Sequence, residues 1–132
     1  MNQRAEAPNG NKYGLLDGTS HVTVIPAPSD AFTGSGPYYR VGTVAVFNAD
    51  NAGVVVNVYI NNGSGTRTQI DSQLLDASPP TTVDDICTYT SADRFPHGIL
   101  VRGPEFVEVN LGSAASPAPT YYATWAEVRG DS

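Results

Sequence analysis

The side chains in this sequence that could do chemistry are few and scattered. Its histidines are His21 and His97, and its one cysteine is Cys87. Nucleophilic catalysis needs a thiol or hydroxyl, a histidine base and an orienting acid in one place. The only Cys/His set is Cys87 and His97 with Asp84 or Asp85, and no hydrolase signature such as Gly-x-Ser-x-Gly surrounds any serine. We therefore expect a protein that is not an enzyme, in which Cys87 serves as a small buried hydrophobe.

The sequence also lacks the residue patterns that usually mark metal and cofactor sites. The sequence has no His-x-His pair, and Asp84 and Asp85 point to opposite sides of an extended chain. Asp50 lies between two asparagines but lacks the Asp-x-Asp-x-Asp-Gly spacing of a calcium loop, so we expect a structural loop acid there. Glycine-rich phosphate-binding motifs are absent too. The sequence predicts no metal and no cofactor.

Composition narrows the class of protein. The chain has 132 residues, enough for one domain, with 13 glycines and 10 prolines that predict many short elements. A net charge of -6 and a single lysine argue against a nucleic-acid partner. The longest apolar run is far too short to span a membrane. The first residues lack the apolar segment of a signal peptide. A single cysteine excludes a disulfide within the chain. We expect synthesis in a cytoplasm, with residence there or within a larger assembly.

Apolar and polar residues alternate with a period of two along most of the chain. Such runs, rich in Val, Thr and Tyr, suit half-buried strands, and no helical stripe accompanies them. The runs are residues 21–24, 38–47, 54–61, 107–111 and 120–128. The prediction is an all-β fold, an antiparallel two-sheet β-sandwich or small jelly roll, with an up-and-down barrel as the alternative.

Polar or glycine-containing turns separate these strands. They lie at residues 48–53, at 61–65 with its Asn62-Gly63 pair, and at Gly103-Pro104. Because a parallel crossover needs a dozen residues or more, loops this short predict antiparallel neighbours, and so a hairpin at each turn.

The first twenty residues are small and polar and are predicted to form an extended N-terminal arm. Only Tyr13, Leu15 and Leu16 could pack there, so they are the candidate partner-binding residues of the arm. The sandwich domain is then expected to cover residues 21–132.

A long loop at about residues 76–97 interrupts the strand pattern, with at most one short element around residues 86–89. Long loops in small domains are usually functional or disordered. Arg94, Phe95 and His97 are its candidate partner-binding residues.

Aromatic side chains cluster on the predicted strands. Adjacent tyrosines on a strand face opposite ways, so one of each pair faces solvent or a partner. These aromatics could cover the core edge, form a platform for carbohydrate, or bind protein; they are Tyr38-Tyr39, Tyr59, Tyr121-Tyr122 and Trp125.

Three segments resemble the strand–turn–strand patterns of small phage structural proteins. Residues 44–60 run from a strand through Asn-x-Asp and a polar turn into a Val-rich strand. Residues 99–111 are similar to a later hairpin of the same group, and residues 120–128 to its closing strand. The loop at residues 76–96 departs from the pattern, being longer and richer in proline.

This resemblance implies a β-sandwich component of a tailed-phage virion, most of all a capsid decoration or cement protein. Such proteins are often trimers at the junctions of capsomers, with an N-terminal arm on the capsid lattice. The implied partner is the major capsid protein or another virion protein, and the implied location is the capsid surface. Deleting residues 1–20 is then expected to leave the fold intact and to abolish shell binding. A tail, baseplate or head-fibre component and a carbohydrate-binding module are the alternatives.

Overall fold

The computed structural model describes residues 6–28 and 38–128, and within them the fold is all-β, as predicted. One short helix, α1 (Ser91–Arg94), interrupts the strands. The strands are β1 (Glu6–Leu15), β2 (Val22–Ile25), β3 (Tyr38–Phe47), β4 (Val54–Asn61), β5 (Arg67–Leu75), β6 (Thr88–Thr90), β7 (Ile99–Arg102), β8 (Phe106–Leu111) and β9 (Thr120–Val128).

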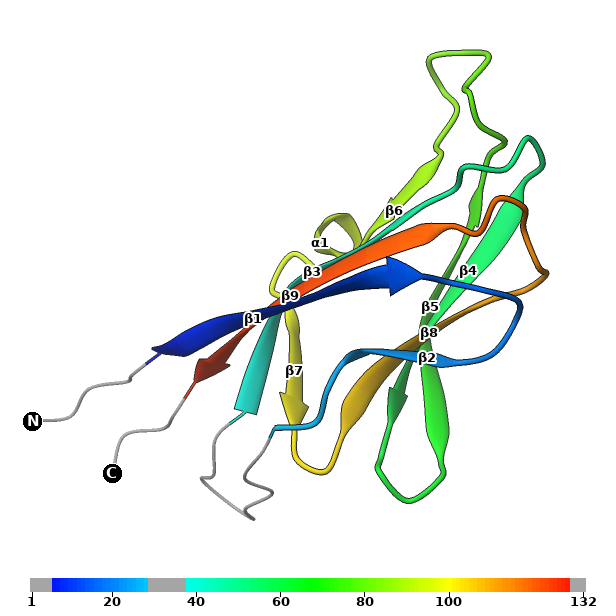
Figure 1. Cartoon of the computed structure of the whole chain (residues 1–132). Coiled ribbons are helices and arrows are strands. Elements are labelled where there is room, and N and C mark those ends of the chain that lie inside the picture. The colour runs from blue at the N-terminus through cyan, green and yellow to red at the C-terminus, as the bar shows by residue number, and fades with distance from the viewer. Residues whose placement is uncertain (1–5, 29–37, 129–132) are drawn as a thin grey trace, which may run out of the picture.

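The strands form two sheets, which confirms the predicted antiparallel sandwich. Sheet A has the order β1-β9-β3-β6, and β7 pairs with another part of β3. Sheet B has the order β2-β8-β4-β5. Every strand pair is antiparallel. Figure 1 shows β1, β9 and β3 side by side in one layer and β2, β8 and β4 in the other.

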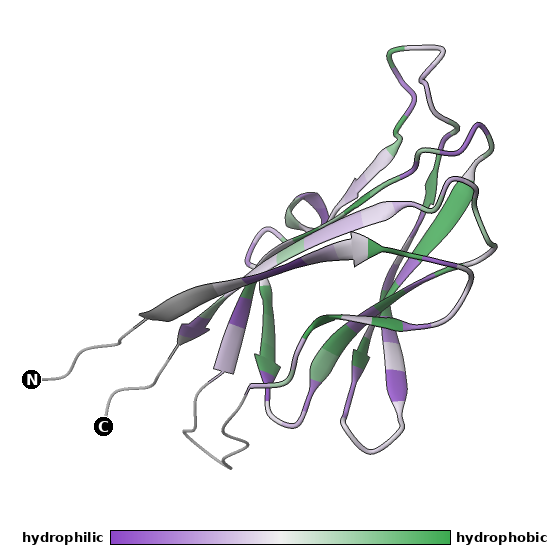
Figure 2. Ribbon diagram, in the orientation of Figure 1, coloured by the Kyte–Doolittle hydropathy of each residue, from purple (hydrophilic) through white to green (hydrophobic). Residues whose placement is uncertain are grey.

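The core lies between the sheets and is built mainly from valine. Figure 2 shows hydrophobic residues concentrated along β4, β7 and β8, between polar turns. Fully buried side chains from both sheets include Val24, Ile25, Val44, Val46, Val56, Val58, Leu75, Tyr89, Val101, Val107 and Val109. Branched side chains of this kind pack well on a pleated surface.

A register shift in β3 changes which residues face the core. Opposite β9, the pairing slips between Val41 and Thr43, with Gly42 at the irregularity. Val41 is buried, and beyond the shift Val44 and Val46 are buried as well. The strict alternation predicted for this strand is therefore wrong, because a β-bulge inserts one residue and reverses the faces that follow.

Only one of the three predicted hairpins is present. β4 and β5 pair through the turn containing Gly63, whose φ of 82° suits glycine. The turn after β3 leads from sheet A to sheet B, and so does the Gly103-Pro104 turn between β7 and β8. The two hairpin predictions at those turns are wrong, because a few extended residues also span the roughly 10 Å between packed sheets.

The predicted N-terminal arm is instead, over Glu6–Leu15, an edge strand of sheet A. β1 pairs with β9 from Glu6 opposite Val128 to Leu15 opposite Thr120. Leu16 follows it into the core at 1% exposure, and its amide donates to the Pro119 carbonyl at 2.8 Å. Residues 6–16 therefore belong to the sandwich, and the boundary predicted between an arm at residues 1–20 and a domain at residues 21–132 cuts through it. Residues 1–5 lie outside the described part of the chain.

Candidate interaction surface

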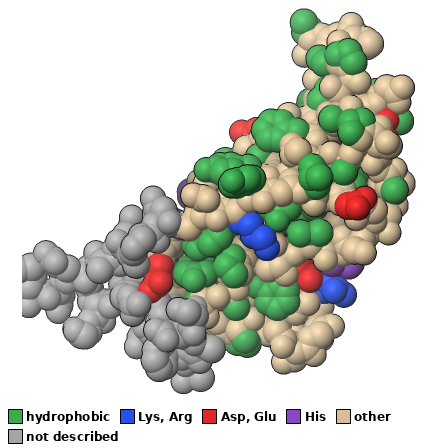
Figure 3. All heavy atoms as spheres, viewed as in Figure 1, with side chains coloured by type: hydrophobic (Ala, Val, Ile, Leu, Met, Phe, Trp, Pro, Cys, Tyr) green, Lys and Arg blue, Asp and Glu red, His purple; other side chains and the backbone are tan. Residues whose placement is uncertain are grey.

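Four large apolar side chains lie exposed together on the outer side of sheet A. They are Tyr13 (76% exposed) and Leu15 (60%) on β1, Phe47 (47%) on β3 and Tyr122 (42%) on β9. Tyr13 is paired with Tyr122, while Leu15 and Phe47 both lie opposite Thr120. Figure 3 shows hydrophobic side chains gathered over these strands. We call these four residues the apolar face. An exposed apolar cluster of this kind is a candidate interaction surface.

Two glycines on the inner side of β1 allow this strand to pack closely over side chains of β9. A Cβ at Gly14 would lie 3.2 Å from the ring of Tyr121, and one at Gly10 would overlap the indole of Trp125. Rings from β9 therefore fill the space beneath β1. Between these glycines, Lys12 donates from Nζ to the Thr23 carbonyl of β2 at 2.6 Å and so links the two sheets. The alternate residues Tyr13 and Leu15 consequently point outward.

A hollow of about 610 Å³ adjoins the apolar face. Its lining includes Arg40 and Gly42 of β3, Thr124 of β9 and Tyr122 of the apolar face. A Cβ at Gly42 would lie 2.6 Å from Thr124 Oγ1, so the glycine keeps the two strands close. The hollow gives the surface a polar border, as is usual at the rim of a protein interface.

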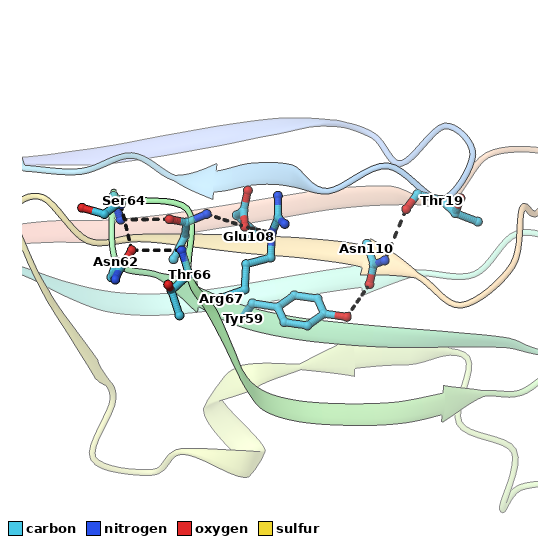
Figure 4. A network of polar contacts seen from close by, with 10 residues as sticks. Thr19, Tyr59, Asn62, Ser64, Thr66, Arg67, Glu108 and Asn110 are labelled. Carbon is cyan, nitrogen blue, oxygen red and sulfur yellow. Dashed lines mark hydrogen bonds and ion pairs between the residues drawn. The ribbon is translucent and has the colours of Figure 1, made fainter.

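The outer side of sheet B is different, because its polar groups bond to one another. Glu108 is buried and accepts a hydrogen bond from Arg67 Nε at 2.6 Å. Asn110 accepts one from the Tyr59 hydroxyl at 3.0 Å and donates to the Thr19 carbonyl at 3.2 Å (Figure 4). Because these groups satisfy one another, sheet A offers the better surface for a partner.

The three residues predicted for the long loop, which contains both β6 and α1, have different surroundings. Arg94 forms an ion pair with Asp71 of β5, through Nη2 to Oδ1 at 2.9 Å and Nε to Oδ2 at 3.0 Å. Phe95 is half-buried against the core, and His97 is exposed. The buried Tyr89 donates its hydroxyl to the same carboxylate at 2.8 Å. Arg94 thus fastens the loop to sheet B.

Replacing Asp71 by asparagine is expected to lower the free energy of unfolding by about 1–2 kcal/mol at pH 7. Burial favours the neutral acid, but hydrogen bonds from Arg94, Tyr89 and the Ser72 amide outweigh it and hold the pKa of Asp71 below its ordinary 3.8. A lowered pKa contributes stability above the ordinary value, and this is lost as pH falls through the folded-state pKa. Urea unfolding of both proteins from pH 7 to pH 2.5 should show the difference shrink below about pH 4. A constant difference would contradict this role.

The residues considered for catalysis or metal binding are not assembled into a site. Cys87 lies beside Asn48, whose amide donates to the Cys87 carbonyl, whereas His97 lies near Arg40 toward the other end of β3. The Asp50 carboxylate accepts hydrogen bonds from the amides of Ala52 at 3.2 Å and Ser116 at 2.9 Å. Across residues 6–28 and 38–128, no three His, Cys, Asp or Glu side chains are grouped as a metal site.

Trp125 does not stand free as a sugar platform would. It is half-buried under β1, with its ring centroid 5.9 Å from that of Tyr39 and the planes inclined by 34°. Sequence reasoning found Tyr13 and Leu15 and flagged the Tyr121-Tyr122 pair, but it missed Phe47. The bulge in β3 decides the orientation of Phe47, and only its glycine marks that bulge in the sequence.

In the described part of the chain, no helix has the length and apolar character needed to cross a membrane.

Comparison with known proteins defines the fold of the chain. No protein-family model matches it, and no curated protein matches its sequence. A chain in the acid-stable capsid structure of Helicobacter pylori bacteriophage KHP30 is similar, with a TM-score of 0.56 and 13% identity over 97% of this chain and 93% of that one. A chain of Bacillus endospore appendages, described as disulfide-linked pili, is similar at a TM-score of 0.53 and 13% identity over 100% and 92%. At this identity, the likeness establishes a shared β-rich fold.

Proposed function

We propose that this protein is a non-enzymatic structural component of a phage virion that binds and stabilises the capsid surface as a decoration or cement protein. The observation that carries the proposal is the apolar face, where Tyr13 and Leu15 stand beside Tyr122 and Phe47. The strand patterns that resemble small phage structural proteins support it. The fold shared with a chain of a phage capsid structure is consistent with it.

Stabilisation in this role needs binding alone. A protein that binds the assembled shell, and not its dissociated subunits, shifts the equilibrium toward the shell by mass action. Tyrosine, phenylalanine and leucine supply apolar area, and the two tyrosines add hydroxyls at the border. A trimer of this chain, seated on the major capsid protein or another virion protein, belongs to the same proposal.

The double substitution Tyr13→Ser and Leu15→Ser tests the assigned surface. We expect at least about a tenfold loss of affinity for empty capsids of the phage that encodes the chain, measured by co-sedimentation, because exposed aromatic and apolar anchors dominate such interfaces. Leu74→Ser is the matched control, since Leu74 is 59% exposed on sheet B and Leu15 is 60% exposed on sheet A. Equal binding by the double variant and the unchanged protein would remove the apolar face from the proposal.

A tail, baseplate or head-fibre component would use the same fold at another site of the virion. Gold labelling of intact particles separates these locations, and label confined to the tail would contradict the capsid assignment. A carbohydrate-binding module has less support, because Trp125 packs beneath β1 instead of standing in solvent.

A further inference from the structure

The outer edge of β1 has no strand beyond it in the described part of the chain. In sheet A, β1 is the terminal strand, and it forms a ladder with β9 alone. Figure 1 shows β1 at the margin of its layer. The backbone along a free strand edge presents a row of unpaired donors and acceptors, which is a template for another strand. The group that fits this edge is therefore an extended chain.

The ladder between β1 and β9 determines which backbone groups of β1 point outward. The Leu16 amide donates to the Pro119 carbonyl at 2.8 Å, directly beyond the last residue of β1. In an antiparallel ladder, residues that bond to one neighbouring strand alternate with residues whose N–H and C=O point to the other side. The pairing is regular from Asn9 to the end of β1, and Leu16 bonds toward β9. The residues whose N–H and C=O point outward are therefore Asn11, Tyr13 and Leu15.

This second half of β1 lacks the irregularities by which proteins keep sheet edges from pairing. Bulges, proline and short length are common protections of an edge. The register shift of β1 and Pro8 both lie before Asn9, in the first half of the strand. In the second half, the outward side chains include Tyr13 and Leu15, which are 76% and 60% exposed. We call residues 10–15 the open edge.

The remaining sheet edges in the described part of the chain are protected. β2, β6 and β7 have four, three and four residues. β5 has nine residues, but its ladder with β4 is irregular between Val58 and Tyr59. Two charged residues of β5, Arg67 and Asp71, are held in ion pairs, and its other exposed residues are mostly polar. Residues 10–15 thus form the regular, apolar edge of this fold.

The same edge of a second copy fits the open edge in one register. With two antiparallel β1 strands centred on Tyr13, each Tyr13 lies opposite the second copy's Tyr13, and Asn11 lies opposite the second copy's Leu15. Every outward-pointing residue then meets an outward-pointing residue, and each pair exchanges two N–H···O bonds. Centring the strands on Lys12 would set two lysines opposite each other, which is destabilising. A centre nearer the N-terminus would bring in Pro8 and the register shift.

Side chains on both sides of the sheet suit this register. On the outer side, Tyr13 is already paired with Tyr122 of β9, so the row of aromatic rings continues into the second copy. Aromatic pairs across strands stabilise a sheet. On the inner side, Lys12 lies opposite the second copy's Gly14, which has no side chain to meet it. Lys12 therefore keeps its hydrogen bond to the Thr23 carbonyl.

We infer that β1 pairs antiparallel with β1 of a second copy about Tyr13, which joins two copies of sheet A into one continuous sheet. The contact is two-fold and closes as a dimer, and it leaves other surfaces for the trimer of the proposed function. A pairing this short buries less area than a standard interface, so the dimer is weak. The inference goes beyond the proposed function because it joins copies of the chain through their backbone, and it merges two apolar faces into one surface.

Cysteine substitution tests the register. In a Cys87→Ser background, Tyr13→Cys should give a disulfide-linked dimer on mild oxidation, because residues in a hydrogen-bonded pair have Cα atoms about 5.5 Å apart, within reach of a disulfide. Asn11→Cys is the matched control, since its counterpart lies four residues along the second strand, about 13 Å away, and should stay unlinked. A Tyr13→Cys protein that stays unlinked, or equal linking of the two variants, would overturn the inference.

Proline at Asn11 separates backbone pairing from side-chain contacts. Asn11→Pro removes an outward N–H, a change that an edge strand tolerates, and leaves the apolar face unchanged. Sedimentation velocity at concentrations up to about 1 mM, where weak contacts are populated, should show the unchanged chain in a monomer–dimer equilibrium. Asn11→Pro should dimerise at least about tenfold more weakly. Asn11→Val, which keeps the N–H, should dimerise more strongly than the proline variant.

A monomeric unchanged chain, or equal association of the proline and valine variants, would also overturn the inference. Capsid co-sedimentation provides a separate measurement for the proposed function. Asn11→Pro should still bind capsids, whereas Tyr13→Ser with Leu15→Ser should lose capsid binding and still form dimers through its backbone. Dimers that do not bind capsids would contradict the proposed function alone, and monomers that bind capsids would contradict this inference alone. Far-UV circular dichroism verifies that each variant is folded.

Discussion

Replacing Leu16 by alanine is expected to lower the free energy of unfolding by about 3 kcal/mol, whereas the same change at Leu15 should alter it by less than about 0.5 kcal/mol. The two leucines are neighbours in the sequence, but Leu16 is 1% exposed and Leu15 is 60% exposed. The Leu16→Ala variant loses the free energy gained by moving the leucine side chain out of water. It also leaves a cavity beneath the end of β1. Most of the Leu15 side chain is in water, so its truncation leaves no cavity.

Urea unfolding, followed by circular dichroism, measures this pair of variants. The Leu15→Ala protein is the internal control for handling and for the denatured state, because it differs by the same atoms. Equal stability of the two proteins would mean that the segment after β1 is not part of the core, as the arm prediction supposed. The same burial makes deletion of residues 1–20 a poor test of shell binding, since it would remove β1 and expose the rings of Tyr121 and Trp125.

Replacing Gly10 by valine should cost about 2 kcal/mol of stability and change the fluorescence of Trp125. A side chain at Gly10 would overlap the indole ring, so the ring or the strand must move. Trp125 is the only tryptophan of the chain, which makes its emission a direct report on this contact. Fluorescence and urea unfolding of the same samples give both quantities.

Asn11→Val is the matched control for this substitution. Asn11 is the next residue of β1 and is exposed, so the same new side chain points to the opposite side of the strand from Gly10 and away from the space that the indole fills. We expect a change within about 0.5 kcal/mol and an unaltered emission spectrum. If Gly10→Val behaved like Asn11→Val, β1 would not lie over Trp125.

The period-two pattern was sufficient to predict an all-β fold, because alternation is a local property of the strand. Val54, Val56 and Val58 of β4 face the core as their alternation indicates, and so do Val107, Val109 and Leu111 of β8. In β3, the alternation fails at Gly42 because a bulge forms against β9, where the paired residues Thr43 and Thr124 are 81 positions apart in the sequence. The orientation of Phe47, and so one quarter of the apolar face, depends on that long-range pairing.

Loop length could not distinguish a hairpin from a connection between the sheets. The turn at Asn62-Gly63 is specified by local chemistry, and it forms the hairpin expected. The turns after β3 and after β7 have similar lengths but cross the sandwich, because their flanking strands find partners elsewhere in the chain.

By itself, the sequence determined the class of fold and most of the strands. Tertiary structure decided that residues 6–15 are an edge strand, that Leu16 belongs to the core, and that Arg94 is held by Asp71. The physical reason is that strand alternation is encoded by neighbours along the chain. The whole fold, in contrast, selects which strand pairs with a strand edge and which group pairs with a charged side chain. A segment rich in glycine and polar residues, such as residues 6–15, has little local preference for a strand conformation.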